Sequence, residues 1–210
     1  MFKDRSDAGY QLAEKLTPYR GKDAVVLALP RGGVVTGYEI ARALSLPLDI
    51  IAVRKVGAPG NPEYAIGAVD ADGTALLNNA ETATIDRVWL AGEIQTEEKE
   101  ARRRARVYRA GKRPLGIAGK TALIVDDGIA TGLTMRLAVR AAKAKKAKRI
   151  IVAVPVAPPE AVRALKDEGA DKVIVLEPPE GFLGAVGAHY VRFEQVEDAE
   201  VIRLLRSPVP

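Results

Sequence analysis

Residues 123–134 (LIVDDGIATGLT) combine the side chains in this sequence that are best suited to chemistry. An apolar run ends in Asp126 and Asp127, and Thr131 and Thr134 then open a helical pattern. Backbone N–H groups at a helix N-terminus favour an anion such as phosphate, whereas carboxylates repel phosphate and accept hydrogen bonds from hydroxyls. The two features together predict a site for a sugar phosphate. The alternative is a plain strand, turn and helix in which Asp127 or Thr131 only caps the helix.

A second anion-binding candidate is Pro30-Arg31-Gly32-Gly33, which directly follows an earlier apolar run. Glycine allows backbone N–H groups to approach an anion closely, and the Arg31 guanidinium suits phosphate oxygens. A glycine-rich turn that simply starts a helix is the alternative interpretation.

Several kinds of site are excluded by residue counts. The chain has no cysteine and one histidine, His189. These counts exclude disulfides, thiolate zinc sites, iron–sulfur clusters, cysteine nucleophiles and metal sites with several histidines. Any metal is therefore expected to be a hard ion with oxygen ligands.

Length and composition indicate one globular domain over residues 1–210, with 48% hydrophobic and 28% charged residues. The start of the chain is polar, and no apolar run approaches the ~20 residues needed to cross a bilayer, so we expect a cytoplasmic protein without a membrane partner. The net charge of +5 favours an anionic partner. Few Asn, Gln and Met residues beside abundant charge fit a thermophile.

Short β-branched runs alternate with helical patterns, which predicts a parallel α/β sheet. We expect helices after the first, third and fourth of the sheet strands, at 34–44, 131–146 and 159–168. The expected sheet strands are 24–29, 48–53, 121–125, 149–154 and 172–176.

An insertion at 58–116 interrupts this pattern and predicts a flexible loop followed by a small helical lobe. The Gly/Pro content of 57–64 suits a lid, and 65–69 and 74–77 are weaker strand patterns. A long polar helix is expected at about 84–109, with Ile85, Val88 and Trp89 on its buried side. Residues 177–210 form a further loop and closing segment.

The long helix carries a basic run, 99–113, that raises the question of nucleic-acid binding. Glu98 and Glu100 precede Arg102 and Arg104 by four residues, the spacing of stabilising ion pairs. The charges surround the helix, so a solvated helix is favoured over a nucleic-acid surface.

The 123–134 motif resembles the PRPP-binding loop of type I phosphoribosyltransferases, where PRPP is 5-phosphoribosyl 1-diphosphate. Two other segments extend the resemblance. Pro30-Arg31-Gly32-Gly33 is similar to the diphosphate-binding loop of this family, in which a cis non-proline peptide is often found, and Arg54-Lys55 resembles the pair before its flexible catalytic loop. The resemblance implies an α/β parallel-sheet type I phosphoribosyltransferase fold with a small inserted lobe, or hood.

The resemblance also implies Mg²⁺-dependent transfer of phosphoribose from PRPP to a purine or pyrimidine base, with release of diphosphate, as in nucleotide salvage. Asp126 and Asp127 would bind the ribose and are the only residues expected near the metal, while Arg31, Gly32 and Gly33 would bind diphosphate. Arg31 and Lys55 would stabilise the departing charge. The 5′-phosphate would be held by Ala130, Thr131, Gly132, Leu133 and Thr134.

One departure bears on the base. Family members that act on 6-oxopurines have an aspartate at the position of Ala130, so the loop looks more like that of adenine or uracil enzymes. Adenine enzymes carry an acid on the flexible loop, and Glu63 is nominated here as proton donor or acceptor; a lid carboxylate facing water is the alternative. The resemblance also implies that the C-terminal loop within 177–210 is the base-recognition region. Phe182 in this loop either stacks on the base or plugs the loop, and His189 is expected to be structural.

Three functions stay open at this point: the transferase, a PRPP- or nucleotide-sensing regulator that binds nucleic acid, and a hydrolase with water as acceptor. We expect a homo-oligomer, and nucleic acid is not the favoured partner.

Overall fold

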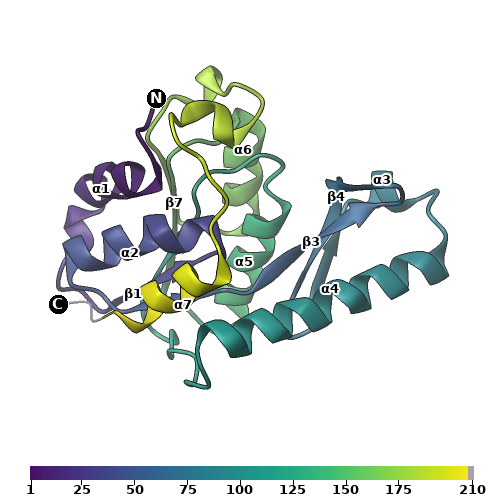
Figure 1. Cartoon of the computed structure of the whole chain (residues 1–210), viewed down its shortest axis with the longest axis horizontal. Coiled ribbons are helices and arrows are strands. Elements are labelled where there is room, and N and C mark those ends of the chain that lie inside the picture. Colours follow the sequence, from purple (N-terminus) through teal and green to yellow (C-terminus); the bar gives the residue numbers. More distant parts are fainter. Residues whose placement is uncertain (208–210) are drawn as a thin grey trace.

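The computed structural model describes residues 1–207, with only the backbone of Glu63 described at that position. Its centre is a five-stranded sheet in the order β2-β1-β6-β7-β8, and every neighbouring pair is parallel (Figure 1). The predicted parallel α/β sheet is therefore confirmed. Its strands are β1 (Ala24–Ala28), β2 (Leu48–Ile50), β6 (Thr121–Val125), β7 (Arg149–Val154) and β8 (Lys172–Val175).

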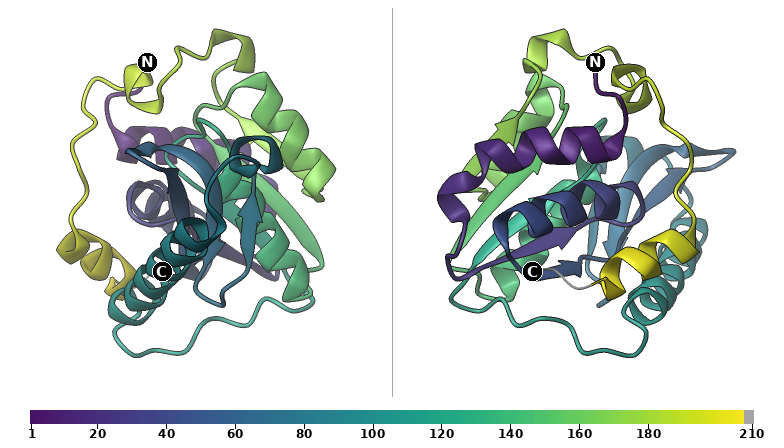
Figure 2. Two further views of the ribbon diagram at one scale, coloured as in Figure 1. Left: turned by 90° about the vertical axis from the view of Figure 1, so that its right-hand side faces the viewer. Right: turned by 60° about the vertical axis from the view of Figure 1, so that its left-hand side comes forward.

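Helices cover both faces of this sheet because alternate residues of a strand point to opposite sides. Leu123 of β6 packs in the cluster that includes α1 (Arg5–Lys15) and α2 (Gly32–Leu44). Ile124, the next residue, packs with α5 (Leu133–Ala144) and α6 (Pro159–Glu168). Figure 2 shows α1 and α2 together on one face. The strands are thus buried on both sides, as their continuous apolar runs require.

The insertion folds as a second sheet with two helices, and we call residues 53–108 the hood. Its strands β3 (Val53–Ala58), β4 (Asn61–Asp70) and β5 (Ala75–Leu77) are antiparallel. They are followed by α3 (Asn79–Thr82) and by the long α4 (Arg87–Tyr108), and Figure 1 shows the hood projecting from the side of the main sheet.

The structure corrects the prediction that 57–64 is a loop. This segment belongs to a hairpin in which β3 and β4 pair from Val53 opposite Asp70 to Ala58 opposite Asn61. The Gly/Pro content marks the tight connection and an irregular register, and Gly60 takes a left-handed φ of 74° in that connection. The hood sheet consequently begins at residue 53 rather than after 58.

The predicted long helix is present as α4. Of the expected buried residues, Ile85 packs against the hood sheet just before the helix begins, but Val88 and Trp89 are exposed. Val88 is 81% exposed and Trp89 is 37% exposed. Leu90 and Ile94, which lie four residues apart on one face, pack instead against Val56 of the hood sheet. Val88 and Trp89 fall outside that stripe.

Two ion pairs predicted on α4 are confirmed. Glu98 lies 2.6 Å from Arg102, and Glu100 lies 2.7 Å from Arg104, measured between side-chain oxygen and nitrogen.

The last segment of the chain follows β8 and contains short turns and one helix. Residues 177–207 contain the 3₁₀ turns η2 (Pro179–Gly181) and η3 (Val186–His189), and then α7 (Asp198–Arg206); a third such turn, η1 (Thr17–Tyr19), follows α1. Residues 208–210 of the predicted closing segment lie outside the described residues. Across residues 1–207 no helix is long and apolar enough to cross a membrane.

Candidate active site

The two predicted anion-binding segments meet at one edge of the main sheet. β1 and β6 are parallel neighbours with Ala28 opposite Val125, so the loops after both strands leave from the same edge. An ideal Cβ on Gly32 would lie 1.9 Å from Asp127 Oδ2. A Cβ at this position would force the loop or the Asp127 carboxylate to shift. A glycine at residue 32 therefore allows the Arg31 loop to lie against the acidic pair.

The peptide bond between Pro30 and Arg31 is cis, as the sequence resemblance predicts. The Arg31 side chain contacts a carboxylate outside the acidic pair. Its Nη1 lies 3.5 Å from Asp198 Oδ1 at the start of α7, and the same carboxylate accepts a 2.6 Å hydrogen bond from Tyr108 Oη of α4. The loop, the hood and the C-terminal helix thus share one carboxylate.

The acidic pair is held by hydrogen bonds. The Asp127 N–H donates to Asp126 Oδ1 at 2.8 Å, and Tyr190 Oη donates to the Asp127 carbonyl at 2.6 Å. Burial, followed by the neighbouring Asp127 charge, holds the pKa of Asp126 well above its ordinary value. Arg5 Nε lies 2.6 Å from Asp127 Oδ2. The two adjacent carboxylates therefore stand in different electrostatic surroundings.

The predicted 5′-phosphate segment opens α5, which begins at Leu133 directly after Gly132. Ala130 and Thr131 are exposed, whereas Gly132 is buried. A cavity of about 340 Å³ lies beside Thr131, with hood residues on its other side. Its lining residues are Tyr64, Ala65, Leu77, Asn78 and Asn79 from the hood and Thr131, Leu133 and Arg136 from the main domain.

Two nominated catalytic residues come from the hood rather than from the sheet edge. Lys55 lies on β3 opposite Ala68 and is half-buried. Glu63 lies on β4, and its side chain is outside the described part of the chain. The neighbouring Tyr64 lines the cavity that reaches Thr131. The hairpin therefore stands next to the phosphate segment.

His189 is buried and supports the loop that carries Phe182, in keeping with a structural role. It is 2% exposed. Its Nδ1 lies 2.5 Å from Glu177 Oε2, and its Nε2 accepts a 3.0 Å hydrogen bond from the Leu183 N–H. Phe182 is half-buried and stacks on the His189 ring at 5.4 Å between centroids. This packing favours the plug interpretation of Phe182.

The sequence patterns do not reveal three residues at this site: Arg5, Tyr190 and Asp198. One signal points to the helix of Arg5. Asp4 precedes an amphipathic stretch, and its side chain accepts from the Asp7 N–H, as an N-cap does. Nothing local indicates that Arg5 meets Asp127, which is 122 residues away in the chain.

The parallel sheet, the paired strand-end loops and the hood are those of the type I phosphoribosyltransferase fold. A family model for the phosphoribosyl transferase domain matches residues 6–188. The chain belongs to this phosphoribosyl transferase domain family.

Known proteins resemble almost the whole chain. The crystal structure of TT1426 from Thermus thermophilus is 44% identical, with a TM-score of 0.79 over 97% of both chains. AQ2163 from Aquifex aeolicus shares the fold, at 12% identity and a TM-score of 0.52 over 82% of this chain and 73% of that one.

A Mycobacterium tuberculosis protein named “Putative phosphoribosyl transferase” is 41% identical over 207 residues. That match covers 98% of this chain and 46% of the relative, so the chain spans about half the length of the curated relatives it matches.

Proposed function

We propose that this chain transfers the phosphoribosyl group from PRPP to a nitrogenous base and releases diphosphate. The observation that carries the proposal is the meeting of Gly32 with Asp127 at the edge of adjacent parallel strands. In open α/β sheets, ligands bind at this carboxyl edge. The carboxylates suit the ribose hydroxyls, and the loop beside them suits diphosphate.

The start of α5 supplies the 5′-phosphate end of the proposed site. Backbone N–H groups of residues 130–134 lie at a helix N-terminus, where the dipole favours an anion. The hydroxyls of Thr131 and Thr134 add donors. PRPP would therefore span from this loop, across Asp127, to the Arg31 loop.

Mg²⁺ fits the donor chemistry because carboxylate and diphosphate oxygens are hard ligands. Within residues 1–207 no group of three or more His, Cys, Asp or Glu side chains is arranged to hold a metal ion. The ion would be held mainly by PRPP oxygens and water, with Asp126 and Asp127 as the protein carboxylates assigned to it. When bound, it would offset negative charge on the leaving diphosphate.

The hood would exclude water and complete the site. Lys55 would stabilise the departing diphosphate, and Glu63 would exchange a proton with the base. Phe182 would offer the base its exposed edge. Closure matters because water that reaches the ribose would hydrolyse PRPP.

Further proposals concern the acceptor base, the oligomeric state, the cellular location and the pathway. Ala130 favours an adenine- or uracil-like acceptor over a 6-oxopurine. We expect a cytoplasmic homo-oligomer that acts in nucleotide salvage.

The test measures diphosphate release from Mg²⁺-PRPP with each of a panel of purine and pyrimidine bases and with none. Release that depends on one base is expected and names the acceptor. Release without a base would indicate a hydrolase, and PRPP binding without release would indicate a sensor.

The matched variant is Asp127→Asn, which keeps an oxygen that can accept from Arg5 but removes the charge that receives the ribose hydroxyls. We expect PRPP affinity to fall about 10–100-fold, since hydrogen bonds to charged groups contribute ~1.5–3 kcal/mol. Equal PRPP affinity in variant and parent would exclude the ribose role of Asp127.

A further inference from the structure

Arg5 is a tightly placed cation at the candidate site. Besides the Asp127 ion pair, its Nη1 donates to the Glu194 carbonyl at 2.8 Å. Its guanidinium carbon lies 3.8 Å from the centroid of the Phe193 ring. The Arg5 side chain is only 11% exposed. These contacts fix the guanidinium plane, because a stacked ring and two hydrogen bonds leave it little freedom.

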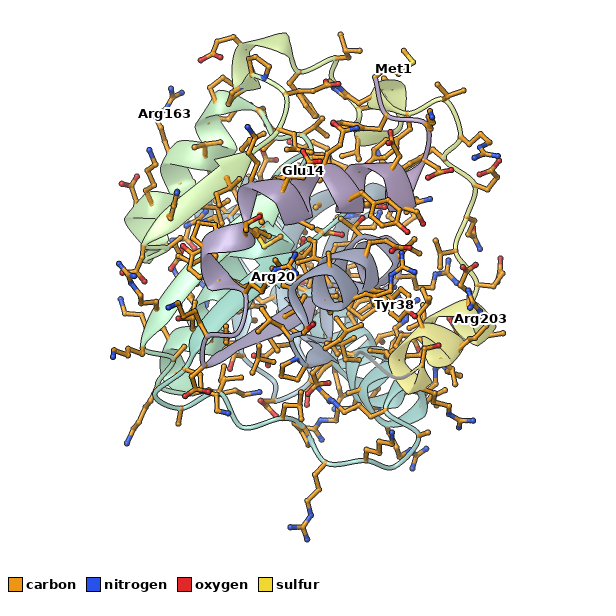
Figure 3. The ribbon with its side chains drawn as sticks, turned by 90° about the vertical axis from the view of Figure 1, so that its left-hand side faces the viewer. Met1, Glu14, Arg20, Tyr38, Arg163 and Arg203 are labelled. Atoms are coloured by element: carbon orange, nitrogen blue, oxygen red, sulfur yellow. The ribbon has the colours of Figure 1, made fainter. Side chains whose placement is uncertain are left out.

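The same guanidinium lies against the proposed diphosphate loop. An ideal Cβ on Gly32 would be 2.8 Å from Arg5 Nε. Arg5 thus touches both the ribose carboxylate and the loop that follows β1. Figure 3 shows why the N-terminal helix reaches this place: α1 starts near Met1, beside the extended C-terminal stretch that leads to α7.

One amino group of Arg5 is left for a ligand. Among the described residues, Nε and Nη1 have hydrogen-bond partners and Nη2 has none. The buried side-chain atoms of the described chain that lack a hydrogen bond belong to Thr36 and Glu39, so Nη2 is not fully buried. Arginine only donates hydrogen bonds and cannot lose its proton in a protein. The ligand of this group must therefore accept hydrogen bonds, and the fixed positive charge favours an anion.

Arg31, the arginine that the sequence assigns to diphosphate, is directed to Asp198 instead. A carboxylate offers about four lone-pair positions. Asp127 can therefore hold Arg5 and still accept hydrogen bonds from ribose hydroxyls.

We propose that Arg5 binds the diphosphate of PRPP and links it to the ribose carboxylate Asp127. This inference rests on the proposed function. The planar guanidinium matches phosphate oxygens in a way that the compact lysine ammonium does not. The N-terminal helix α1 is accordingly part of the substrate site.

The test compares three ligands by isothermal titration calorimetry: Mg²⁺-PRPP, Mg²⁺-diphosphate and ribose 5-phosphate. For Arg5→Met we expect affinity for the two diphosphate-bearing ligands to fall about 10–100-fold, the loss of one charge-assisted contact. Affinity for ribose 5-phosphate should stay within about twofold, because it lacks the diphosphate that Arg5 contacts.

Arg192→Met is the matched control. Arg192 lies in the same region and pairs with Asp4, but its side chain is 64% exposed. The substitution removes the same charge, so unchanged affinity for all three ligands is expected. Arg5→Lys keeps the charge without the planar fork and should weaken the two diphosphate ligands less than Arg5→Met does. If Arg5→Met does not fold, Arg5→Lys carries the comparison.

Two outcomes would overturn the inference while the proposed function stands. One is unchanged PRPP affinity in both Arg5 variants. The other is an equal loss for ribose 5-phosphate and PRPP, which would mean that Arg5 only positions Asp127. A parent protein that does not bind Mg²⁺-PRPP would instead overturn the proposed function and this inference together.

Discussion

The sheet edge that carries the candidate site and the hood beside it are stabilised in different ways. Every residue of β1 is buried, and the loops that follow β1 and β6 approach too closely for a Cβ at residue 32. In α4 of the hood, by contrast, only Ala101 and Tyr108 are buried among 22 residues, and much of its surface carries ion pairs. Packing fixes the edge, whereas exposed contacts hold much of α4. The hood sheet itself is packed, with Val53, Ala68 and Leu76 in the same core cluster as β1.

This difference suits the two parts of the proposed reaction. Ribose and diphosphate groups need donors and acceptors held in position before they bind. A lid must move with little cost, and elements with few buried contacts open most easily. Lys55 and Glu63 lie on the hood hairpin, whereas Asp126 and Asp127 directly follow β6 at the packed edge.

The largest expected effect comes from adding one methyl group at the edge. Gly32→Ala would place a Cβ 1.9 Å from Asp127 Oδ2, so the loop or the carboxylate must move. We expect PRPP affinity to fall at least ~100-fold and the free energy of unfolding to fall by about 2 kcal/mol, as for other strained close contacts. Calorimetric titration with PRPP and urea unfolding measure the two quantities.

Gly92→Ala is the same change in the hood. A Cβ at Gly92 meets nothing within 4 Å, and Gly92 lies inside α4. Alanine there should raise the free energy of unfolding by about 0.5–1 kcal/mol and leave PRPP affinity unchanged. Similar effects of the two substitutions would refute the contrast between edge and hood.

A smaller effect is expected from the ionisation of Asp126, which lies at the sheet edge. Because the pKa of Asp126 is raised by folding, the folded state binds more protons than the unfolded state above the ordinary Asp value of about 3.9. The free energy of unfolding therefore falls as pH rises through that window. Asp126→Asn removes this titration and should be more stable than the parent by about 1 kcal/mol at pH 8.

Urea unfolding between pH 4 and pH 8 checks the sign. The stability difference between Asp126→Asn and parent should be small near pH 4 and grow with pH. A difference that shrinks as pH rises would mean that folding lowers the pKa of Asp126 instead. If Asp126→Asn is more stable than the parent but binds PRPP more weakly, then Asp126 lowers the stability of the fold and contributes to PRPP binding.

Local patterns in the sequence predict the main sheet and the acidic pair, because buried parallel strands are continuous apolar runs. The placement of Asp126 beside Gly33 follows from the strand ends. The contacts of Arg5 and Asp198 could not be predicted, because each joins segments about 90 or more residues apart. The hairpin could not be told from a loop, since Gly57 and Pro62 fit both a lid and an irregular β ladder.

The smallest effect is expected on the hood surface. Glu100 accepts hydrogen bonds from Arg103 and Arg104, and the Arg103 bond is the main cause that lowers the pKa of Glu100 to about 2. Because folding lowers this pKa, the ionised Glu100 stabilises the fold at pH values above the ordinary Glu pKa. This stabilisation is lost as pH falls toward 2. These side chains are partly exposed, so solvent screens their charges. Glu100→Gln should therefore lower the free energy of unfolding by only about 0.5 kcal/mol.

Urea unfolding in low and high salt measures this loss of stability. The loss should vanish in about 1 M salt, while the loss caused by Gly32→Ala, which is steric, should persist. A Glu100→Gln loss as large as that of Gly32→Ala would mean that the hood is held as rigidly as the edge.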